Sequence, residues 1–252
     1  MAKEDAMQTI DRAIRILKSF SVDDKELSLA DLHRVLGLSK SSLQRILNTL
    51  VLHGLLDKDQ KQKTYQLGME LYFLGQLVEK NSHLLSVSRS FMEKLRDELG
   101  ESVSLSVIHH RERKCIGYVP SNHELTTLIF VGQTSPLYAG ASAKILMAYL
   151  PEKELAEYVT GMEFEKITQF TIKSKEDLYK ELVKIRRNGF ATSYGERVKG
   201  AFSVSAPIMN RFQDVVASLS LTIPTVRVDE DNIEYYIDHV KKTAQLISEK
   251  LV

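Results

Sequence analysis

The sequence predicts an α+β fold in two domains, a small helical one with a hairpin and a larger one built on an antiparallel sheet. The chain has 252 residues, which is more than one average domain needs. Its first third carries apolar residues at helical spacing, whereas the remainder alternates strand-like and helix-like segments. Tight turns such as 110–113 join neighbouring strand segments, and such turns are typical of an antiparallel sheet.

Composition excludes several classes of protein. The chain is 43% hydrophobic and 27% charged, as globular proteins are, and its net charge of +1 means that any nucleic-acid surface must be local. The single cysteine, Cys115, cannot form an intramolecular disulfide, and the acids among positions 1–10 do not fit a secretory signal. The longest apolar run, at 145–150, is far shorter than the roughly 20 residues that span a membrane. We therefore expect a cytoplasmic protein without a membrane partner.

Three helices are predicted in the N-terminal domain. Apolar residues at helical spacing predict the first helix over 7–20. Ser28 is suited to cap a second helix, with Asp31 completing a capping box, and Gly37 is suited to end it. Ser39 is suited to cap the third helix, and the tight turn between the second and third helices is typical of a helix-turn-helix.

The third helix has two different faces. Leu43, Ile46, Leu47 and Leu50 follow helical spacing and predict its buried side. The opposite side has no acid and carries short or planar polar side chains. Such side chains bond phosphate oxygens and base edges, as arginine does with guanine and glutamine or asparagine with adenine. The residues of this helix that we expect to contact DNA are Ser39, Lys40, Ser41, Ser42, Gln44, Arg45, Asn48 and Thr49.

A polar hairpin follows the third helix. Residues 55–67 form two strand-like runs around a lysine-bearing tip, which predicts a winged helix with this hairpin as its wing. Lys58, Lys61 and Lys63 of the wing are expected to contact the DNA backbone. Over 34–63 six cations accompany two acids, a local excess of +4. The polar face could instead only solvate an exposed helix, but its place between the turn and a cationic hairpin favours double-stranded DNA.

Helical spacing returns over 69–99, with a break at Asn81 and Ser82. We therefore divide the chain into a winged helix-turn-helix domain at 1–68, a linker helix at 69–81 and a second domain at 82–252. In the second domain we expect strands at 103–109, 114–119, 126–131, 190–193, 202–208 and 215–222, and helices at 140–150, 151–160, 174–188 and 230–251.

Small and polar residues in the second domain indicate a pocket for an anion. Residues 135–144 lead from a loop into a helix through small side chains, so a carboxylate could approach the unpaired amides at the helix start. Hydroxyls alternate along two strands, at 203–205 and 218–222, and this alternation places each set on one face of its strand. These hydroxyls could instead bond neighbouring backbone groups.

Several ordered segments resemble the IclR-type family of bacterial transcriptional regulators. LSLADLHRVLGLSKSSLQRILNTLVLHGLL at 27–56 is similar to the family's helix-turn-helix, and TYQLGMELYFLG at 64–75 to its wing exit and linker helix. VGQTSPLYAGASAKILMAYLP at 131–151, and SVSAPI followed by VVASLSLTIP at 203–224, resemble blocks of its effector domain.

The resemblance implies a DNA-binding regulator, expected to be a repressor, with a GAF-like C-terminal domain that binds a small organic or aromatic acid. It also implies a homodimer or dimer of dimers on a palindromic operator. Lys144 matches a family lysine that we interpret as structural. Relatives often carry aspartate at the position of Ser193 and cysteine at that of Ser203. By position, the implied effector contacts are Ala141, Ser142, Ser193, Ser203, Ser220 and Thr222.

Other chemistry has little support in the sequence. His109, His110 and Cys115 are of zinc-ligand type, but adjacent strand residues point to opposite faces, so both histidines cannot readily bind one ion. Cys115 near cations could be a redox thiolate, although a buried strand cysteine is the favoured interpretation. Neither a G-x-S-x-G elbow nor a phosphate-binding loop occurs. We expect no catalytic residue, metal or cofactor; the rival interpretations are a small-acid metabolic enzyme with an accessory DNA-binding head and an effector-independent DNA-binding protein.

Overall fold

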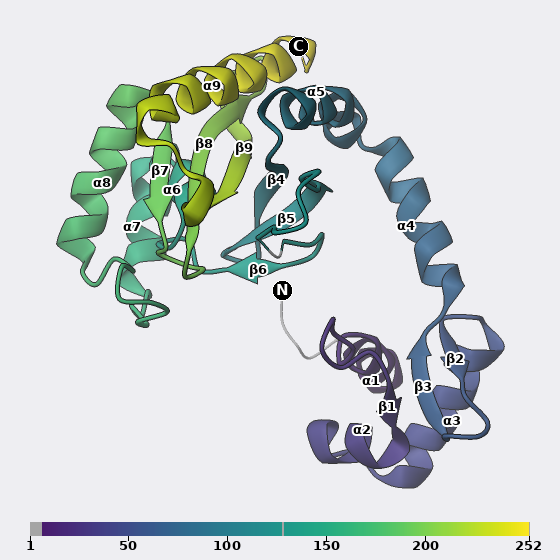
Figure 1. Ribbon diagram of the computed structural model, residues 1–252. Helices are drawn as coiled ribbons and strands as arrows, with labels where there is room; N and C mark the ends of the chain where they lie inside the picture. The colour runs from purple at the N-terminus through teal and green to yellow at the C-terminus, as the bar shows by residue number, and fades with distance from the viewer. Residues whose placement is uncertain (1–6, 128, 252) are drawn as a thin grey trace. The chain divides into compact units, whose positions relative to one another are not determined.

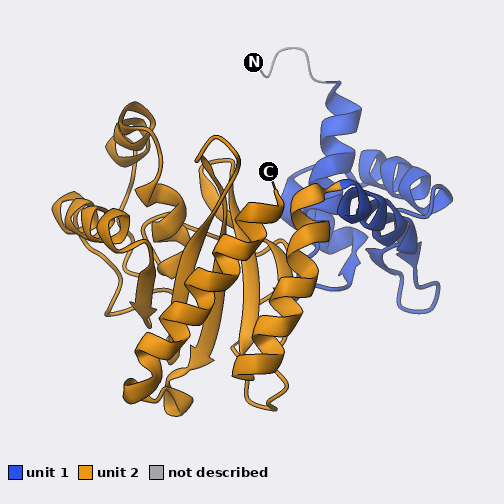
Figure 2. Ribbon diagram, turned by 90° about the horizontal axis from the view of Figure 1, so that it is seen from above, with its two compact units in different colours: residues 1–81 blue, residues 82–252 orange. Residues whose placement is uncertain are grey.

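The computed structural model describes residues 7–127 and 129–251. The chain divides into two compact units, unit 1 at residues 1–81 and unit 2 at residues 82–252, coloured separately in Figure 2. Each unit has a hydrophobic core of its own. No helix of the described part combines the length and the apolar character needed to cross a bilayer.

Unit 1 is a helical head with a small antiparallel sheet, followed by a further helix (Figure 1). The sheet has the strand order β1-β3-β2. Its core is formed by fully buried apolar side chains, among them Ile16, Leu32, Leu43 and Leu47. In chain order the elements are α1 (Gln8–Leu17), β1 (Leu27–Ser28), α2 (Leu29–Leu36), α3 (Lys40–Leu52), β2 (Leu56–Lys58), β3 (Thr64–Leu67) and α4 (Met69–Asn81).

The predicted helix ends of the head are confirmed where local chemistry fixes them. Ser28 accepts a hydrogen bond from the Asp31 amide while the Asp31 carboxylate accepts from the Ser28 amide, which is the predicted capping box. Gly37 ends α2 with a φ of 67°, a conformation that favours glycine. The helix predicted over 7–20 is shorter, because after Leu17 the chain turns towards β1. That strand was not predicted, since it forms only by pairing with β3.

Unit 2 contains an antiparallel sheet with the strand order β6-β5-β4-β9-β8-β7. Its strands are β4 (Ser102–His109), β5 (Glu112–Val119), β6 (Thr134–Ser135), β7 (Ala191–Tyr194), β8 (Ala201–Met209) and β9 (Val215–Pro224). Its helices are α5 (His83–Leu99), α6 (Ala141–Ala148), α7 (Glu152–Thr160), α8 (Lys175–Asn188) and α9 (Ile233–Lys250).

The two faces of this sheet differ in chemistry. Along β9, Leu219 and Leu221 point to a face that is packed under α5 and α9 in the apolar core. Ser218, Ser220 and Thr222 alternate with them and therefore point to the other face. Strands β4 and β8 repeat this pattern, so the second face is a buried surface rich in hydroxyl groups, which we call the serine face.

Helix α6 lies against the serine face, and α7 and α8 pack on the outer side of α6 (Figure 1). Nearly every side chain of α6 is buried, including that of Lys144. An apolar cluster around Ile145, Leu178 and Leu182 holds α6 and α8 together. The start of α6 is therefore fixed over the hydroxyl groups of the sheet.

Two predictions for unit 2 are wrong in detail. The strand predicted at 126–131 does not form among its described residues, and Leu128 lies outside them. The edge of β5 pairs instead with β6, through Arg113 opposite Ser135 and Lys114 opposite Thr134. The helix predicted over 230–251 begins as a 3-10 turn at Glu230–Asn232, before α9.

Candidate functional site

The predicted buried and exposed faces of α3 are both found in unit 1. Leu43, Ile46, Leu47 and Leu50 are buried in the core of the head. On the opposite side Ser42 and Gln44 are half-buried, and the others are exposed. None of the thirteen residues of α3 is acidic. The exposed members of the predicted set are Ser39, Lys40, Ser41, Arg45, Asn48 and Thr49.

Hydrogen bonds leave some of these side chains free and engage others. Ser39 caps α3, its Oγ accepting from the Ser42 amide at 3.3 Å. The Gln44 amide donates to Asn48 Oδ1 at 2.8 Å and to the Tyr65 hydroxyl at 3.2 Å. Within the described chain no acid pairs with Arg45. Arg45 and the NH2 group of Asn48 are therefore exposed planar donors that remain available on this face, whereas the Gln44 amide is bound by Asn48 and Tyr65.

The hairpin β2–β3 carries the predicted lysines. Lys61 and Lys63 are exposed at its tip, which Asp59 closes by accepting from the Lys61 amide at 2.7 Å. Lys58 is half-buried, with its Nζ 5.6 Å from the centre of the Tyr65 ring. Tyr65 thus contacts both Lys58 and Gln44, which links the hairpin to α3.

One cation of the predicted basic segment is compensated. Arg34 Nη2 lies 2.7 Å from Asp31 Oδ1, an acid just outside 34–63. The uncompensated positive charge of 34–63 is therefore smaller than the sequence count of +4. The other cations of this segment lie on α3 and the hairpin.

Unit 2 has a cavity between the serine face and the start of α6. The cavity is narrow: the centres of water-sized molecules have about 30 Å³ of room, within about 400 Å³ of non-atom space that includes open solvent. All six predicted effector residues line it, although they come from four separate elements. They are Ala141 and Ser142 of α6, Ser193 of β7, Ser203 of β8, and Ser220 and Thr222 of β9.

The start of α6 is only partly open. The Gly140 amide, at the N-cap position, donates to Glu196 Oε2 at 2.9 Å, so the chain's own carboxylate occupies one donor. Ala141 and Ser142 follow as the first two helical residues, where amides lack an acceptor four residues earlier in the helix. An anion in the cavity would therefore be bound by these two amides beside Glu196.

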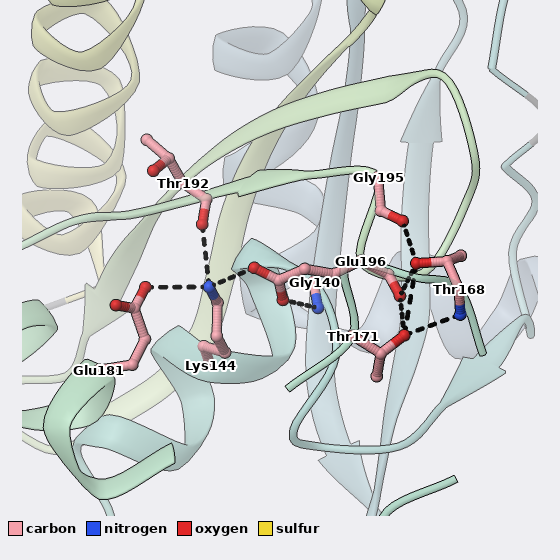
Figure 3. Close-up of polar contacts among 8 residues, drawn as sticks. All are labelled: Gly140, Lys144, Thr168, Thr171, Glu181, Thr192, Gly195 and Glu196. Atoms are coloured by element: carbon pink, nitrogen blue, oxygen red, sulfur yellow. Dashed lines mark hydrogen bonds and ion pairs between the residues drawn. The ribbon is translucent and has the colours of Figure 1, made fainter. Parts of the chain in front are cut away.

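Lys144 neutralises the carboxylate that occupies the helix start. Its Nζ donates to Glu196 Oε1 at 2.7 Å, to Glu181 Oε1 at 3.0 Å and to the Thr192 carbonyl at 3.0 Å (Figure 3). Lys144 is 1% exposed and all three donors are engaged. This agrees with the interpretation of Lys144 as structural.

Threonine hydroxyls hold the loop that carries Glu196. Thr171 Oγ1 donates to the Glu196 carbonyl at 2.7 Å, and Thr168 Oγ1 donates to the Gly195 carbonyl at 2.6 Å (Figure 3). A segment between α7 and α8 thus fixes the loop between β7 and β8. The position of the Glu196 carboxylate is set by these contacts and by Lys144 together.

The hydroxyl groups of the cavity differ in how they are bonded. Ser220 Oγ lies 2.6 Å from Ser205 Oγ, so part of its bonding capacity goes to a neighbouring strand. The alternative left open by the sequence was a bond to backbone, whereas this contact joins two side chains. No described side chain or backbone group bonds the hydroxyl of Ser203 or Thr222. These two hydroxyls are available to a ligand.

Sequence reasoning missed two arginines of the cavity, Arg113 and Arg197. Strand β5 has a β-bulge at Ile116, opposite Leu105 and Ser106 of β4. Leu105 pairs with Gly117 and Ser106 pairs with Cys115, so Ile116 is the extra residue that shifts the register. Without the shift, Arg113 would lie on the same face as Gly117 and point into the apolar core. With it, Arg113 points to the serine face and its Nε donates to Ser106 Oγ at 2.9 Å.

A signal for another missed residue is present in the sequence. Ser104 lines the cavity, and it belongs to an alternating series with Ser102 and Ser106 like that of β9. Arg197 and Glu196 have no such signal, because they lie in the loop between β7 and β8. Their place follows only from tertiary contacts.

Burial lowers the pKa of both arginines. Burial and, to a smaller extent, the nearby positive charge of Arg113 together lower the pKa of Arg197 to about 10. Burial also lowers the pKa of Arg113. Because a pKa of about 10 is well above neutrality, Arg197 still carries its charge at pH 7.

The histidines and the cysteine outside the cavity were weighed as metal or redox groups. The two histidine rings lie with centroids 4.1 Å apart, because His110 is in the turn with a φ of 51° and not on the strand. The expectation that they point to opposite faces is therefore wrong. Among the described residues, no group of three or more potential ligands could hold a metal ion. Cys115 is buried, and burial raises the pKa of its thiol, as expected for a core cysteine.

Comparison with known proteins identifies both units. The model of the IclR helix-turn-helix domain matches residues 9–60, and that of the C-terminal region of bacterial transcriptional regulator IclR matches residues 76–249. The chain is 29% identical over 245 residues to the HTH-type transcriptional regulator XynR of Escherichia coli K12, covering 97% of each protein.

Solved structures agree with these matches. IclR of Thermotoga maritima is 28% identical with a TM-score of 0.80, over 98% of this chain and 99% of that one. An IclR homologue of Microbacterium hydrocarbonoxydans, solved with 4-hydroxybenzoate, has the same fold at 23% identity, with a TM-score of 0.86 over 97% and 99% of the two chains. The family matches extend over most of both units, and the chain therefore belongs to the IclR family of DNA-binding bacterial transcriptional regulators.

Proposed function

We propose that this chain is a cytoplasmic repressor that binds a palindromic operator and responds to a small organic acid held in the cavity of unit 2. The observation that carries the DNA-binding part is the acid-free exposed face of α3, where Arg45 is unpaired among the described residues. Its position between the α2–α3 turn and a lysine-bearing hairpin fits the docking of a winged helix on duplex DNA. The proposed role is regulation without catalysis.

In this proposal α3 enters the major groove and the hairpin follows the backbone. Arg45 is suited to donate to the O6 and N7 atoms of a guanine, and Asn48 retains its amide NH2 group for a base edge or phosphate. Lys61 and Lys63 are suited to phosphates, which position the protein without reading sequence. Gln44 acts through Tyr65, by fixing the angle between helix and hairpin.

The proposed effector binds where amides and hydroxyl groups converge. A carboxylate is suited to the amides of Ala141 and Ser142, and hydroxyl donors of Ser203 and Thr222 lie on the opposite wall. The relative solved with 4-hydroxybenzoate supports an acid as the ligand class. Effector binding can change operator affinity only if the acid binds the DNA-competent and incompetent states unequally.

Helix α4 is the proposed dimer contact. None of its residues is buried, although it is largely apolar. An exposed apolar patch of this kind marks a surface that contacts another protein. Two heads joined in this way, or two such dimers, would bind the two halves of a palindrome. Its exposed apolar residues are Met69, Tyr72, Phe73, Leu74, Leu77 and Val78.

Replacing Leu77 with glutamate is expected to convert the dimer to monomers. Leu77 is 58% exposed, so the substitution leaves the core of the single chain unchanged, yet it places a charge in the proposed contact. Operator affinity should fall by about 100-fold, because the second half-site no longer binds in the same complex. Sedimentation velocity and fluorescence anisotropy measure the two effects. Val183→Glu, at an exposed apolar position of α8, is the control, and a dimeric Leu77→Glu protein would exclude α4 as the contact.

The proposal as a whole is tested by selecting bound duplexes from a random pool and titrating the selected operator with a panel of small acids. We expect a palindromic consensus and at least one acid that changes the operator Kd by about 5-fold or more. Transcription in vitro from a promoter with this operator should fall when the protein is added.

The rival functions predict different results in the same titration. If duplexes are selected but no acid changes their affinity, the protein is an effector-independent DNA-binding protein. Consumption of one of the acids by the protein would favour the metabolic enzyme. If no duplex is selected, the proposed function is wrong.

A further inference from the structure

Arg113 reaches the cavity from the serine face with an unused donor. It is 1% exposed, and its Nε donates to Ser106 Oγ at 2.9 Å. Its Nη1 is buried, and no group in residues 7–127 or 129–251 accepts a hydrogen bond from it. A buried donor without a partner is costly, and a guanidinium more so than a neutral group. The donor at this wall of the cavity therefore requires an acceptor.

Arg197 approaches the same space from the loop between β7 and β8. Its Cβ and Nε would each lie 3.9 Å from a Cβ atom at Gly140, so its stem passes directly over the start of α6. None of the described carboxylates pairs with it. Both arginines line the same cavity, and the positive charge of Arg113 contributes to the lowered pKa of Arg197.

The acid present in the cavity wall does not compensate the arginines. Glu196 is engaged by Lys144 through Oε1 and by the Gly140 amide through Oε2. Lys144 also contacts Glu181, which lies outside the cavity lining. Lys144 is therefore shared by two carboxylates, and among the described residues neither Arg113 nor Arg197 has a carboxylate partner.

We propose that the cavity binds a small organic dianion, with two acidic groups or one doubly charged group, in preference to a monocarboxylate. Arg113 and Arg197 each lack a carboxylate partner among the described residues, so two acidic groups could pair with both, and the amides of Ala141 and Ser142 add donors on the same side. A monocarboxylate such as 4-hydroxybenzoate offers only one acidic group to the two guanidinium groups. The inference rests on the proposed function, because it specifies the charge of the same effector.

The test compares acids of similar shape that differ by one charge. The pairs are propionate and malonate, butyrate and succinate, and benzoate and terephthalate, together with perchlorate and sulfate, all at pH 7.5 and constant ionic strength. Thermal shift and calorimetric titration are applied to the wild type, Arg197→Gln and Arg197→Lys. Lys199→Gln is the matched control, since Lys199 is an exposed cation of the same loop outside the cavity lining.

We expect at least one dianion to bind the wild type about tenfold more tightly than its monoanionic partner. Arg197→Gln should lose this preference, Arg197→Lys should retain part of it, and Lys199→Gln should behave as the wild type. Two results would overturn the inference. One is that the two acids of every pair bind the wild type equally tightly. The other is that no dianion raises the Tm of the wild type more than that of Arg197→Gln. Operator affinity of the acid-free wild type is measured in the same buffers. If the dianion preference is absent but the protein still binds the operator, only the dianion inference is rejected. If the protein does not bind the operator either, the proposed function is rejected.

Discussion

Replacing Arg45 with alanine is expected to lower affinity for the selected operator by about 10- to 100-fold and to remove discrimination against a scrambled duplex. One bidentate contact with guanine contributes about 1–3 kcal/mol of discrimination, and each 1.4 kcal/mol is tenfold. Arg45 is exposed and unpaired among the described residues, so its removal leaves the core of the head intact. Fluorescence anisotropy with both duplexes at one salt concentration measures the effect, and circular dichroism checks the fold.

Two variants separate base reading from general attraction to DNA. Arg15→Ala removes an exposed arginine from α1 and should leave both affinities unchanged. The double variant Lys61→Ala/Lys63→Ala should weaken binding to both duplexes alike. It should also flatten the slope of log affinity against log salt by about 2, since each phosphate contact contributes about 0.9. If Arg45→Ala discriminates between the operator and the scrambled duplex as strongly as the wild type does, Arg45 is not a base-reading residue.

Replacing Lys144 with methionine is expected to lower the free energy of unfolding of unit 2 by about 3–5 kcal/mol. Methionine keeps much of the volume but removes the charge that faces Glu196, which is 8% exposed. An uncompensated carboxylate is then left beside the start of α6, and the position of the loop that carries Arg197 should relax. Urea denaturation followed by circular dichroism measures the loss, and acid binding should weaken with it.

A double variant shows whether loss of the Lys144–Glu196 ion pair causes the lower free energy of unfolding. Lys144→Met/Glu196→Gln removes both charges and should be more stable than Lys144→Met alone, because no carboxylate remains uncompensated beside the helix start. Lys184→Met, at an exposed position of α8, should change stability by less than about 0.5 kcal/mol. A Lys144→Met protein as stable as this control would show that the contact with Glu196 contributes nothing.

Features fixed by nearby residues could be predicted from the sequence. The Ser28–Asp31 capping box depends on residues three apart, and the buried side of α3 on the period of the helix. The serine face follows from a period of two, which placed Ser218, Ser220 and Thr222 on one side of their strand, and the family resemblance then selected Ser220 and Thr222. The small residues before α6 correctly placed the start of that helix in the cavity wall.

Features fixed by distant contacts could not be predicted from the sequence. The bulge at Ile116 turns Arg113 to the serine face, and a simple alternation over β5 would have left it in the apolar core. Glu196 bonds the Gly140 amide, 56 positions away, so the helix start is less open than its small residues suggest. Gln44 is bound by Tyr65, 21 positions away, and this removes it from the freely available donors of α3.

The central claim, that the exposed face of α3 lies in the major groove, is tested most directly by methylation interference on the selected operator. Methylation of guanine N7 blocks a major-groove acceptor, whereas methylation of adenine N3 blocks a minor-groove one. We expect N7 methylation of a guanine in each half-site to prevent binding of the wild type, and Arg45→Ala to become indifferent to it. Binding that tolerates N7 methylation at every guanine and is blocked only by N3 methylation would contradict the claim.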